Sequence, residues 1–271
     1  MSYIDPHIHM VSRTTDDYEK LALSGCVALG EPAFWAGFDR SSPQGFFDYF
    51  RQLTEFEPKR ASQFGIRHYT WICMNPKESE DLRLSREVIQ IIPEFIDRPN
   101  VLGVGEIGLN RITRNEIKIF EEQVDLALQY NKLMMVHTPH LEDKKRGTRI
   151  ILDILGNHSA IVPEKILIDH IEEHTVSMVL DSGYWAGMTL YPFSKISVPR
   201  AADVIERFQG ERLMANSGGD WGMSDPLAIP RLKLEMRLRD HSLKMIERVT
   251  FGHAFEFMSQ SGKLPREAMA L

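Results

Sequence analysis

Two histidines near the N-terminus, His7 and His9, flank a single residue in the sequence DPHIH. Successive residues of a β-strand point to opposite faces, so residues two apart share a face. We therefore predict a strand over Tyr3–His9 whose two imidazoles could bind one metal ion. The alternative interpretation is a pair of partly exposed polar side chains at the end of a strand.

Four more side chains that can bind metals stand at, or just after, the ends of apolar runs. They are Glu106 after VLGVG, His137 after LMMV, His170 after ILID and Asp220 after RLMANSGG. Burying such groups together without a partner is costly, because buried charges are paired or bind metal ions. We therefore interpret these four residues, together with His7 and His9, as the ligands of a metal site.

The ligand types indicate which metal binds and what chemistry it supports. Imidazole and carboxylate ligands without thiolates suit several divalent ions; we expect Zn, with Mn, Fe, Co, Ni or Mg as alternatives. Six ligands exceed the four of one tetrahedral site and suffice for two ions that share a bridging carboxylate. Two such ions supply hydroxide near neutral pH, so the set predicts hydrolysis by a metal-bound hydroxide.

The elements that would position these ligands alternate regularly along the chain. The expected strands are Tyr3–His9, Cys26–Leu29, His68–Cys73, Val101–Glu106, Leu133–His137, Ile166–His170, Gly187–Leu190 and Arg212–Asn216. The expected helices are Asp16–Leu23, Gln44–Phe64, Ser79–Phe95, Thr148–Leu155, Thr175–Asp181, Ala201–Phe208 and Ala228–Arg239, with one more after Thr113. At the start of that helix, Thr113 and Glu116 have the spacing of a capping box.

Strict alternation of strands and helices favours a parallel sheet with crossover helices. Eight units predict a single (β/α)₈ TIM barrel over residues 1–271, because such a barrel needs roughly 250 residues. In a barrel the carboxyl ends of the strands meet at one face, which would gather ligands running from His7 to Asp220. An open doubly wound sheet is the structural alternative.

Composition limits the function classes. A chain of 271 residues with 43% hydrophobic and 26% charged residues is globular, and its net charge of −6 does not favour coating nucleic acid or an anionic membrane. The two cysteines, Cys26 and Cys73, lie in apolar runs and are expected to be reduced core residues. The N-terminus lacks a signal-peptide pattern, so we expect a cytoplasmic protein. We also expect a small-molecule substrate in preference to nucleic acid. The oligomeric state is left open.

Loop residues supply the candidates for substrate binding. Trp35, in the long stretch Gly30–Pro43, and Trp221 are expected on loops at the active face, where either could line a pocket or simply pack. His140, three residues after His137, could contact the substrate or remain a loop histidine. The basic run 144–146 could attract an anionic group or be solvated.

Two aspartates adjoin the expected ligands. Asp5 lies two residues before His7 and could orient it or serve the strand terminus. Asp169 immediately precedes His170, so strand alternation predicts that its side chain points away from the site.

In the ordered set of ligands, the chain resembles the TatD family of the amidohydrolase superfamily. The residues that carry this resemblance are the HxH pair, the GEIGL motif at 105–109, the strand ending in His137, His170 and the late Asp220. The resemblance implies that His7, His9 and Asp220 bind one ion and that His137 and His170 bind the other. It further implies that Glu106 bridges them and that Asp220 also shuttles a proton, making both carboxylates catalytic.

The chain departs from the family pattern in its loops. Asn110 follows GEIGL where the family usually has aspartate, Pro139 stands where it usually has arginine, and Asp220 lies in NSGGDWGMSDP rather than in an ETD segment. Such loops contact substrate, so the deoxyribonuclease activity of the family is not carried over. An amidase, lactonase or phosphoesterase acting on a small metabolite is the first alternative, and a non-catalytic, metal-holding barrel is the second.

Overall fold

The computed structural model describes residues 1–265, in which eight parallel strands form one sheet in the order β1 to β8. The strands are β1 (Tyr3–Asp5), β2 (Cys26–Pro32), β3 (Arg67–Ile72), β4 (Val101–Gly108), β5 (Leu133–His137), β6 (Ile166–Asp169), β7 (Trp185–Thr189) and β8 (Leu213–Asn216). Backbone hydrogen bonds from Gly218 to His7 and from His9 to Gly219 then join the segment after β8 to the segment after β1. The predicted TIM barrel is therefore confirmed.

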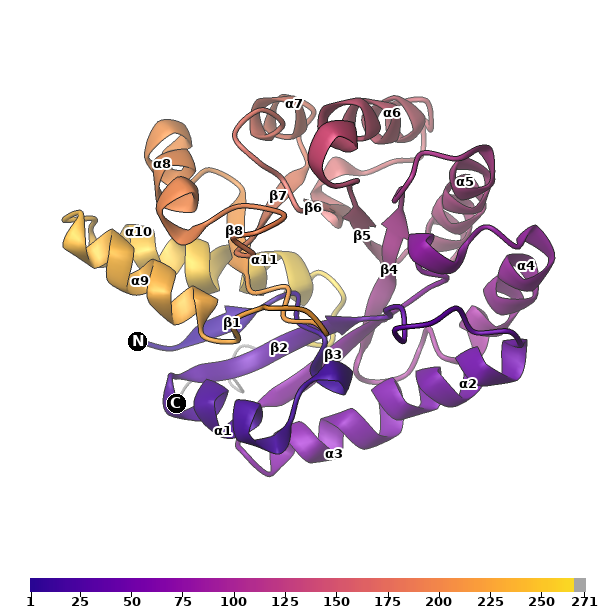
Figure 1. Ribbon diagram of the computed structural model, residues 1–271, viewed down its shortest axis with the longest axis horizontal. Helices are drawn as coiled ribbons and strands as arrows, with labels where there is room; N and C mark the ends of the chain where they lie inside the picture. Colours follow the sequence, from indigo (N-terminus) through magenta and orange to yellow (C-terminus); the bar gives the residue numbers. More distant parts are fainter. Residues whose placement is uncertain (266–271) are drawn as a thin grey trace.

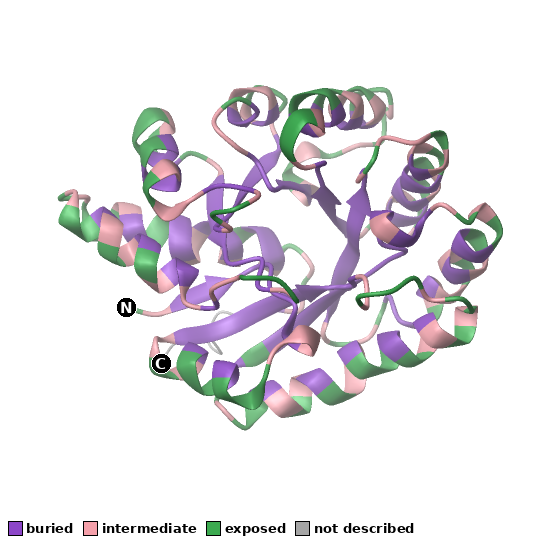
Figure 2. Cartoon of the chain, in the orientation of Figure 1, coloured by how far each residue is buried: buried purple, intermediate pink, exposed green. Residues whose placement is uncertain are grey.

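Helices surround the barrel, as Figure 1 shows. They are α1 (Thr15–Leu23), α2 (Pro43–Arg51), α3 (Glu57–Ser62), α4 (Leu82–Ile91), α5 (Arg114–Gln129), α6 (Lys144–Gly156), α7 (Val176–Asp181), α8 (Val198–Phe208), α9 (Ala228–Leu238), α10 (Leu243–Glu247) and α11 (His253–Ser259). Each surrounding helix buries one face on the sheet and exposes the other, whereas the strands are buried almost throughout (Figure 2). The burial of both sheet faces explains why the strands are apolar runs rather than alternating ones.

Several predicted boundaries were wrong. Strand β1 ends at Asp5, because Pro6 has no N–H to continue the ladder, and the histidines follow it in a short connection. The single helix predicted over Gln44–Phe64 is divided into α2 and α3 by a π-helical turn at Gln52–Phe56. Helices α10 and α11 were not predicted.

Two local predictions are confirmed. Thr113 Oγ1 accepts a hydrogen bond from the Glu116 N–H at 3.1 Å and so caps α5. The Glu116 carboxylate instead accepts hydrogen bonds from the N–H groups of residues 110–112, which fixes the loop that follows β4. Cys26 and Cys73 are both buried and unpaired.

The barrel interior is filled by its own cluster of side chains. Trp71 of β3 is fully buried and stacks on Phe257 of α11, with ring centroids 5.7 Å apart. Most strand residues of this cluster lie toward the amino ends of their strands. Helix α11 packs against them and therefore covers that end of the barrel. The carboxyl end is left for polar side chains. Within residues 1–265, no helix is long and apolar enough to span a bilayer.

Candidate metal centre

Five of the six predicted ligands meet at the carboxyl end of the barrel. His7 and His9 follow β1, Glu106 lies in β4, His137 is the last residue of β5 and His170 directly follows β6. None of the five residues is more than 3% exposed. The convergence of strand ends that the barrel imposes has therefore brought together residues separated by up to 163 positions.

The first pair of imidazoles is His7 and His9, whose Nε2 atoms lie 3.0 Å apart. His7 Nδ1 donates to the carboxylate of Asp169, and His9 Nδ1 donates to the Pro32 carbonyl at 3.2 Å. With both Nδ1 atoms used as donors, the neutral tautomers have bare Nε2 lone pairs that face each other. Only a cation between them, either a proton or a metal ion, makes this approach favourable. Glu106 Oε2 lies 3.7 and 3.9 Å from the two nitrogens.

The second pair is His137 and His170, gathered around the other oxygen of the same carboxylate. Glu106 Oε1 lies 3.0 Å from His137 Nδ1 and 2.8 Å from His170 Nε2, and these two nitrogens are 3.0 Å apart. The Thr189 hydroxyl donates to Asp169, so it accepts from His170 Nδ1 at 2.7 Å. The Nε2 atom of His170 is therefore also a bare acceptor.

Electrostatics keeps three of these groups, Glu106, His9 and His170, in the state that metal ligands need. Burial alone would raise the pKa of Glu106, but His7, His137 and His170 together hold it well below its usual range, so the carboxylate is ionised. Burial lowers the pKa of His9 and of His170 well below that of free imidazole, so both rings are neutral. One ionised carboxylate thus presents an oxygen to each of two pairs of imidazoles.

The donor atoms and their spacing fit divalent metal binding. Two atoms bound to one tetrahedral Zn²⁺ lie roughly 3.4 Å apart, which is close to the 2.8–3.0 Å separations found within each histidine pair and at Glu106 Oε1. His137 Nε2 is buried and has no hydrogen-bond partner among the described residues. Buried polar atoms usually have a hydrogen-bond partner, so this nitrogen is free to contact a metal ion or a molecule bound to one.

Asp169 contradicts the sequence prediction, because its side chain points into the site. The residue after it, His170, has a φ of +61°, so the alternation of an extended strand does not apply across this pair. Asp169 Oδ2 accepts from His7 Nδ1, while Oδ1 accepts from Thr189 and from Asn216. A Cβ at Gly187 would overlap Asp169 Oδ1, so the carboxylate fits only beside glycine.

Asp5 positions the first histidine pair through contacts with the backbone. Its Oδ1 accepts from the N–H of His7 at 3.3 Å and from the N–H of Ser217 at 3.1 Å. It therefore connects the end of β1 to the loop after β8, and burial raises its pKa to about 6. Of the two interpretations considered, positioning of His7 is the one that these contacts support.

Asp220 is the sixth predicted ligand, and the structure does not bring it to the other five. Its Oδ1 accepts from the Tyr191 hydroxyl at 3.2 Å and from the Gly222 N–H at 2.8 Å. The residue is half-buried at the mouth of the barrel, and its charge acts on the buried Lys195. Its role as a metal ligand stays a prediction.

The predicted substrate-binding residues lie around the same mouth. The His140 ring is 5.1 Å from His137 and 5.5 Å from His170, and its Nδ1 is buried without a hydrogen-bond partner among residues 1–265. The Trp221 indole donates to the carbonyl of Trp35, so the two tryptophans lie together.

An apolar cavity of about 370 Å³ adjoins the site. Val11, Phe34, Trp35, Tyr49 and Trp221 are among its lining residues. The Phe34 ring stacks on His9 at a centroid distance of 3.9 Å, which places one wall of the cavity against the first histidine pair. Sequence reasoning missed Phe34, because an isolated aromatic residue in a loop carries no spacing signal.

Sequence reasoning also missed two buried lysines. Lys144 begins the basic run 144–146, but it is fully buried and donates to Thr138 Oγ1 at 2.9 Å and to the His170 carbonyl at 2.6 Å. It therefore fixes the backbone that carries His170. Lys195, in the loop between β7 and α8, is only 9% exposed.

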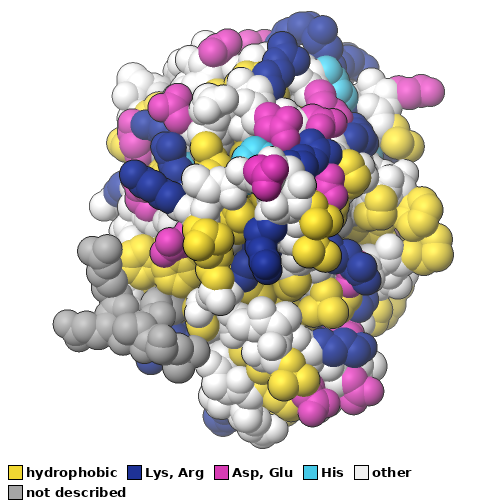
Figure 3. Space-filling view, turned by 90° about the vertical axis from the view of Figure 1, so that its left-hand side faces the viewer, with side chains coloured by type: hydrophobic (Ala, Val, Ile, Leu, Met, Phe, Trp, Pro, Cys, Tyr) yellow, Lys and Arg dark blue, Asp and Glu magenta, His cyan; other side chains and the backbone are white. Residues whose placement is uncertain are grey.

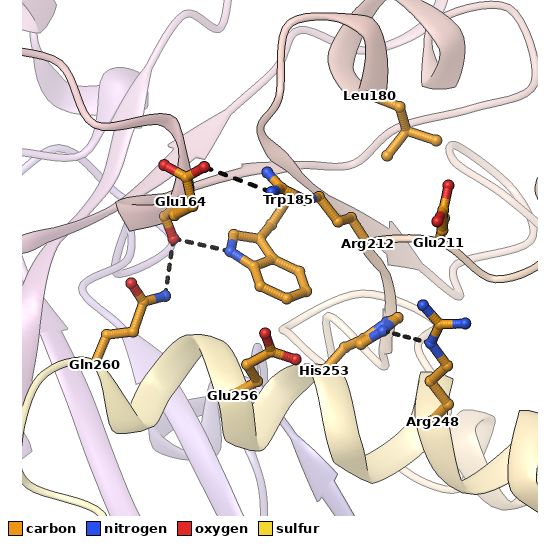
Figure 4. Close-up of a pocket in the computed structure, with 9 residues that line it drawn as sticks. All are labelled: Glu164, Leu180, Trp185, Glu211, Arg212, Arg248, His253, Glu256 and Gln260. Atoms are coloured by element: carbon orange, nitrogen blue, oxygen red, sulfur yellow. Dashed lines mark hydrogen bonds and ion pairs between the residues drawn. The ribbon is translucent and has the colours of Figure 1, made fainter.

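A second cavity, of about 570 Å³, lies at the opposite end of the barrel, at the amino ends of β6–β8 (Figure 4). Two of its contacts involve Glu164: the Trp185 indole donates to the Glu164 backbone carbonyl at 2.8 Å, and Arg212 lies 3.5 Å from the Glu164 carboxylate. Neither the predicted metal ligands nor the predicted substrate-binding residues line this cavity.

Comparisons with known proteins identify the family of this chain. The sequence profile of the TatD related DNase family matches residues 4–227. An uncharacterized metal-dependent hydrolase of Methanocaldococcus jannaschii is 32% identical over 238 residues, which cover 86% of this chain and 90% of that protein. The crystal structure of a TatD-like protein from Archaeoglobus fulgidus is 27% identical, with a TM-score of 0.77 and coverage of 94% of this chain and 99% of that one.

More distant structures share the barrel. The phosphotriesterase homology protein of Escherichia coli is 14% identical, with a TM-score of 0.68 over 95% of this chain and 98% of that one, which shows a common fold. Together with the family and sequence matches, the buried histidines and carboxylates at the carboxyl ends of the barrel strands identify a metal-dependent hydrolase. Within that class, the chain belongs to the TatD family.

Proposed function

We propose that the protein uses two divalent metal ions, Zn²⁺ by preference, to hydrolyse a small-molecule substrate. The single observation that carries the proposal is the position of Glu106, whose Oε1 and Oε2 atoms each face a different pair of histidines. One ion site would take His7, His9 and Oε2. The other would take His137, His170 and Oε1.

Each side chain then has a distinct task. Bound divalent ions would supply hydroxide from water near neutral pH and would polarise the bond to be broken. Asp169 holds His7 in the tautomer whose Nε2 faces the site. Asp220, half-buried at the mouth, is the proposed acceptor of the proton released in the reaction. Glu106 keeps the two halves of the site together.

Two features support a small molecule over nucleic acid. The cavity against Phe34 has the volume of a small-ligand pocket and an aromatic lining that includes Trp35 and Trp221. The net charge of the chain is −6, and the side of the molecule formed by α8, α9 and α10, which is not the face that carries the candidate metal centre, has acidic and basic side chains mixed together (Figure 3). The two unpaired buried cysteines further support a cytoplasmic location.

The possible hydrolase activities differ in the bond that they cleave. A panel of substrates with different scissile bonds tests which activity the protein has. Zinc-loaded protein would be assayed with 4-nitrophenyl acetate, δ-valerolactone, leucine 4-nitroanilide, 4-nitrophenyl phosphate and single-stranded DNA. We expect metal-dependent hydrolysis of at least one small substrate in preference to DNA. DNA as the best substrate would contradict the small-molecule proposal, and inactivity with every substrate would favour a non-catalytic, metal-holding barrel.

A matched pair of variants ties the activity to the site. Glu106→Gln removes the charge shared by the two ion sites, whereas Glu122→Gln makes the same change on α5, where Glu122 pairs with Arg86 near the surface. We expect the first variant to lose activity and bound metal and the second to retain both. Equal activity in the two variants would contradict the role given to Glu106.

A further inference from the structure

Lys195 is a buried lysine that the proposed mechanism does not use. Its backbone is anchored, because its N–H donates to the Tyr191 carbonyl at 2.9 Å and its carbonyl accepts from Arg200 at 2.8 Å. Its side chain is only 9% exposed, and its Nζ lies 5.1 Å from the centroid of the Tyr191 ring. Among residues 1–265, the ammonium group has no hydrogen bond or ion pair.

The contrast with Lys144 shows that this is unusual within the same molecule. Lys144 is fully buried, whereas Lys195 is 9% exposed, and Lys144 donates to two oxygens that compensate for the lost water. A buried ammonium group without such partners costs free energy, and the cost is recovered when an anion binds.

Lys195 faces the candidate metal centre. The loop that carries Lys195 follows β7 at the carboxyl end of the barrel, and Tyr191, whose ring lies beside its Nζ, donates its hydroxyl to Asp220 at the mouth. Burial is the largest cause of the lowered pKa values of four rings around the site, and the positive charge of Lys195 acts in the same direction on each; the four are His9, His137, His140 and His170. The Tyr191 ring supports the ammonium group from the side.

The carboxylates that face Lys195 are already engaged. Glu106, Asp169 and Asp220 all act on its charge. Yet Glu106 contacts the histidine pairs, Asp169 accepts from His7, and Asp220 accepts from Tyr191 and the Gly222 N–H. None of the three accepts a hydrogen bond from Lys195 Nζ among the described residues, so an anionic ligand at the mouth could supply its acceptor.

A second cation and an aromatic wall complete the surroundings. Lys77 lies in the loop after β3, and its Nζ is 5.2 Å from the ring centroids of both Phe34 and Trp35. Its positive charge repels that of Lys195. Two ammonium groups that repel each other across the mouth favour an anionic occupant. The neighbouring rings favour a ligand that also has an apolar part.

We propose that Lys195 forms an anion-binding subsite beside the candidate metal centre, and that the substrate carries a carboxylate or phosphate group that binds its Nζ. This inference rests on the proposed function, because it names the class of substrate that the hydrolase takes. In this account Lys195 contacts the substrate and selects it, while Glu106 and Asp220 serve the bond cleavage.

The kinetic experiment compares two esters with the same scissile bond. The mono-4-nitrophenyl ester of glutaric acid carries a free carboxylate, and its methyl ester is neutral. We expect zinc-loaded wild-type protein to favour the anionic ester, and Lys195→Met to reduce that preference about tenfold to a hundredfold, mainly through KM. Lys195→Arg should keep most of the preference, and Lys145→Met, which removes an exposed charge from α6, should keep all of it.

A binding experiment separates failure of this inference from failure of the proposed function. Calorimetry would measure the binding of inorganic phosphate and of glutarate to zinc-loaded wild type, Lys195→Met and Lys195→Gln, after equal zinc content is verified. We expect weaker binding of one anion in both variants, and the anion that responds identifies the substrate group. This result would support the subsite even if the wild type hydrolysed neither ester.

Two results would overturn the inference. One is equal binding of both anions by wild type and the two variants. The other is an equal loss of activity toward both esters in Lys195→Met, which would show a structural role. Hydrolysis that persists in either case would leave the proposed function intact.

Discussion

The carboxylate of Asp169 accepts a hydrogen bond from Nδ1 of His7, 162 residues away in the sequence, and so leaves His7 Nε2 to face His9. The ring is thereby held in the orientation and tautomer that a metal ligand needs. Partners of this kind usually affect metal affinity by 10-fold to 100-fold, although they do not touch the ion.

Replacement of Asp169 by asparagine tests this relationship. An amide that presents its NH₂ group to His7 Nδ1 favours the opposite tautomer, in which Nε2 carries the proton and cannot bind a cation. We expect Asp169→Asn to weaken binding of one Zn²⁺ ion by about 10-fold to 100-fold in a chelator competition titration. Asp203→Asn, at the surface pair with Arg239, is the control. Unchanged zinc affinity in Asp169→Asn would show that the carboxylate does not orient the ligand.

Asp220 is expected to matter for turnover rather than for folding. Its Oδ1 accepts hydrogen bonds that an amide oxygen can also accept, so Asp220→Asn should keep the fold and most of the bound metal. Loss of the proton acceptor should lower kcat by about 10²-fold to 10⁴-fold on the substrate found in the panel. The measurement is steady-state kinetics beside metal content, with Asp225→Asn in the same loop as control. Unaltered turnover would remove the proton-transfer role.

Gly147 is expected to be intolerant of a side chain. It lies in α6, where alanine normally stabilises a helix, but a Cβ there would overlap the ring of Pro139 and lie 3.3 Å from Ile112. We expect Gly147→Ala to lower the free energy of unfolding by about 1–3 kcal/mol, through overpacking against the loop that holds His140.

The same helix offers the control for this change. A Cβ at Gly156 would meet no atom within 4 Å. Gly156→Ala should therefore leave stability unchanged or raise it by up to about 1 kcal/mol in chemical denaturation. A destabilisation of similar size in both variants would show that the contact with Pro139 is not the cause.

Much of the site could be predicted from the sequence because the barrel fold positions the candidate ligands at its strand ends. The strand at Leu133–His137 was predicted with its observed bounds, and the ends of parallel strands must converge once the sheet closes. The meeting of five candidate ligands was therefore predicted without any knowledge of the loops. Glu106 was expected to link the two halves, and its two oxygens do face different histidine pairs.

The remainder depends on backbone paths that strand periodicity does not describe. Asp169 was misplaced because a left-handed residue follows it, and alternation fails at such a residue. Lys195 and Phe34 lie in loops, where neither a 3.6-residue nor a two-residue period applies. The position of Asp220 relative to the other ligands likewise depends on the glycine-rich turn that precedes it.

The metal content of the zinc-reconstituted protein tests the central claim most directly. Elemental analysis by mass spectrometry, after removal of loosely bound ions on a desalting column, gives the number of ions per chain. The account predicts two Zn²⁺ ions per chain in the wild type and fewer in Glu106→Gln. One ion or none in the wild type would contradict a site in which each Glu106 oxygen, with its own pair of histidines, binds an ion.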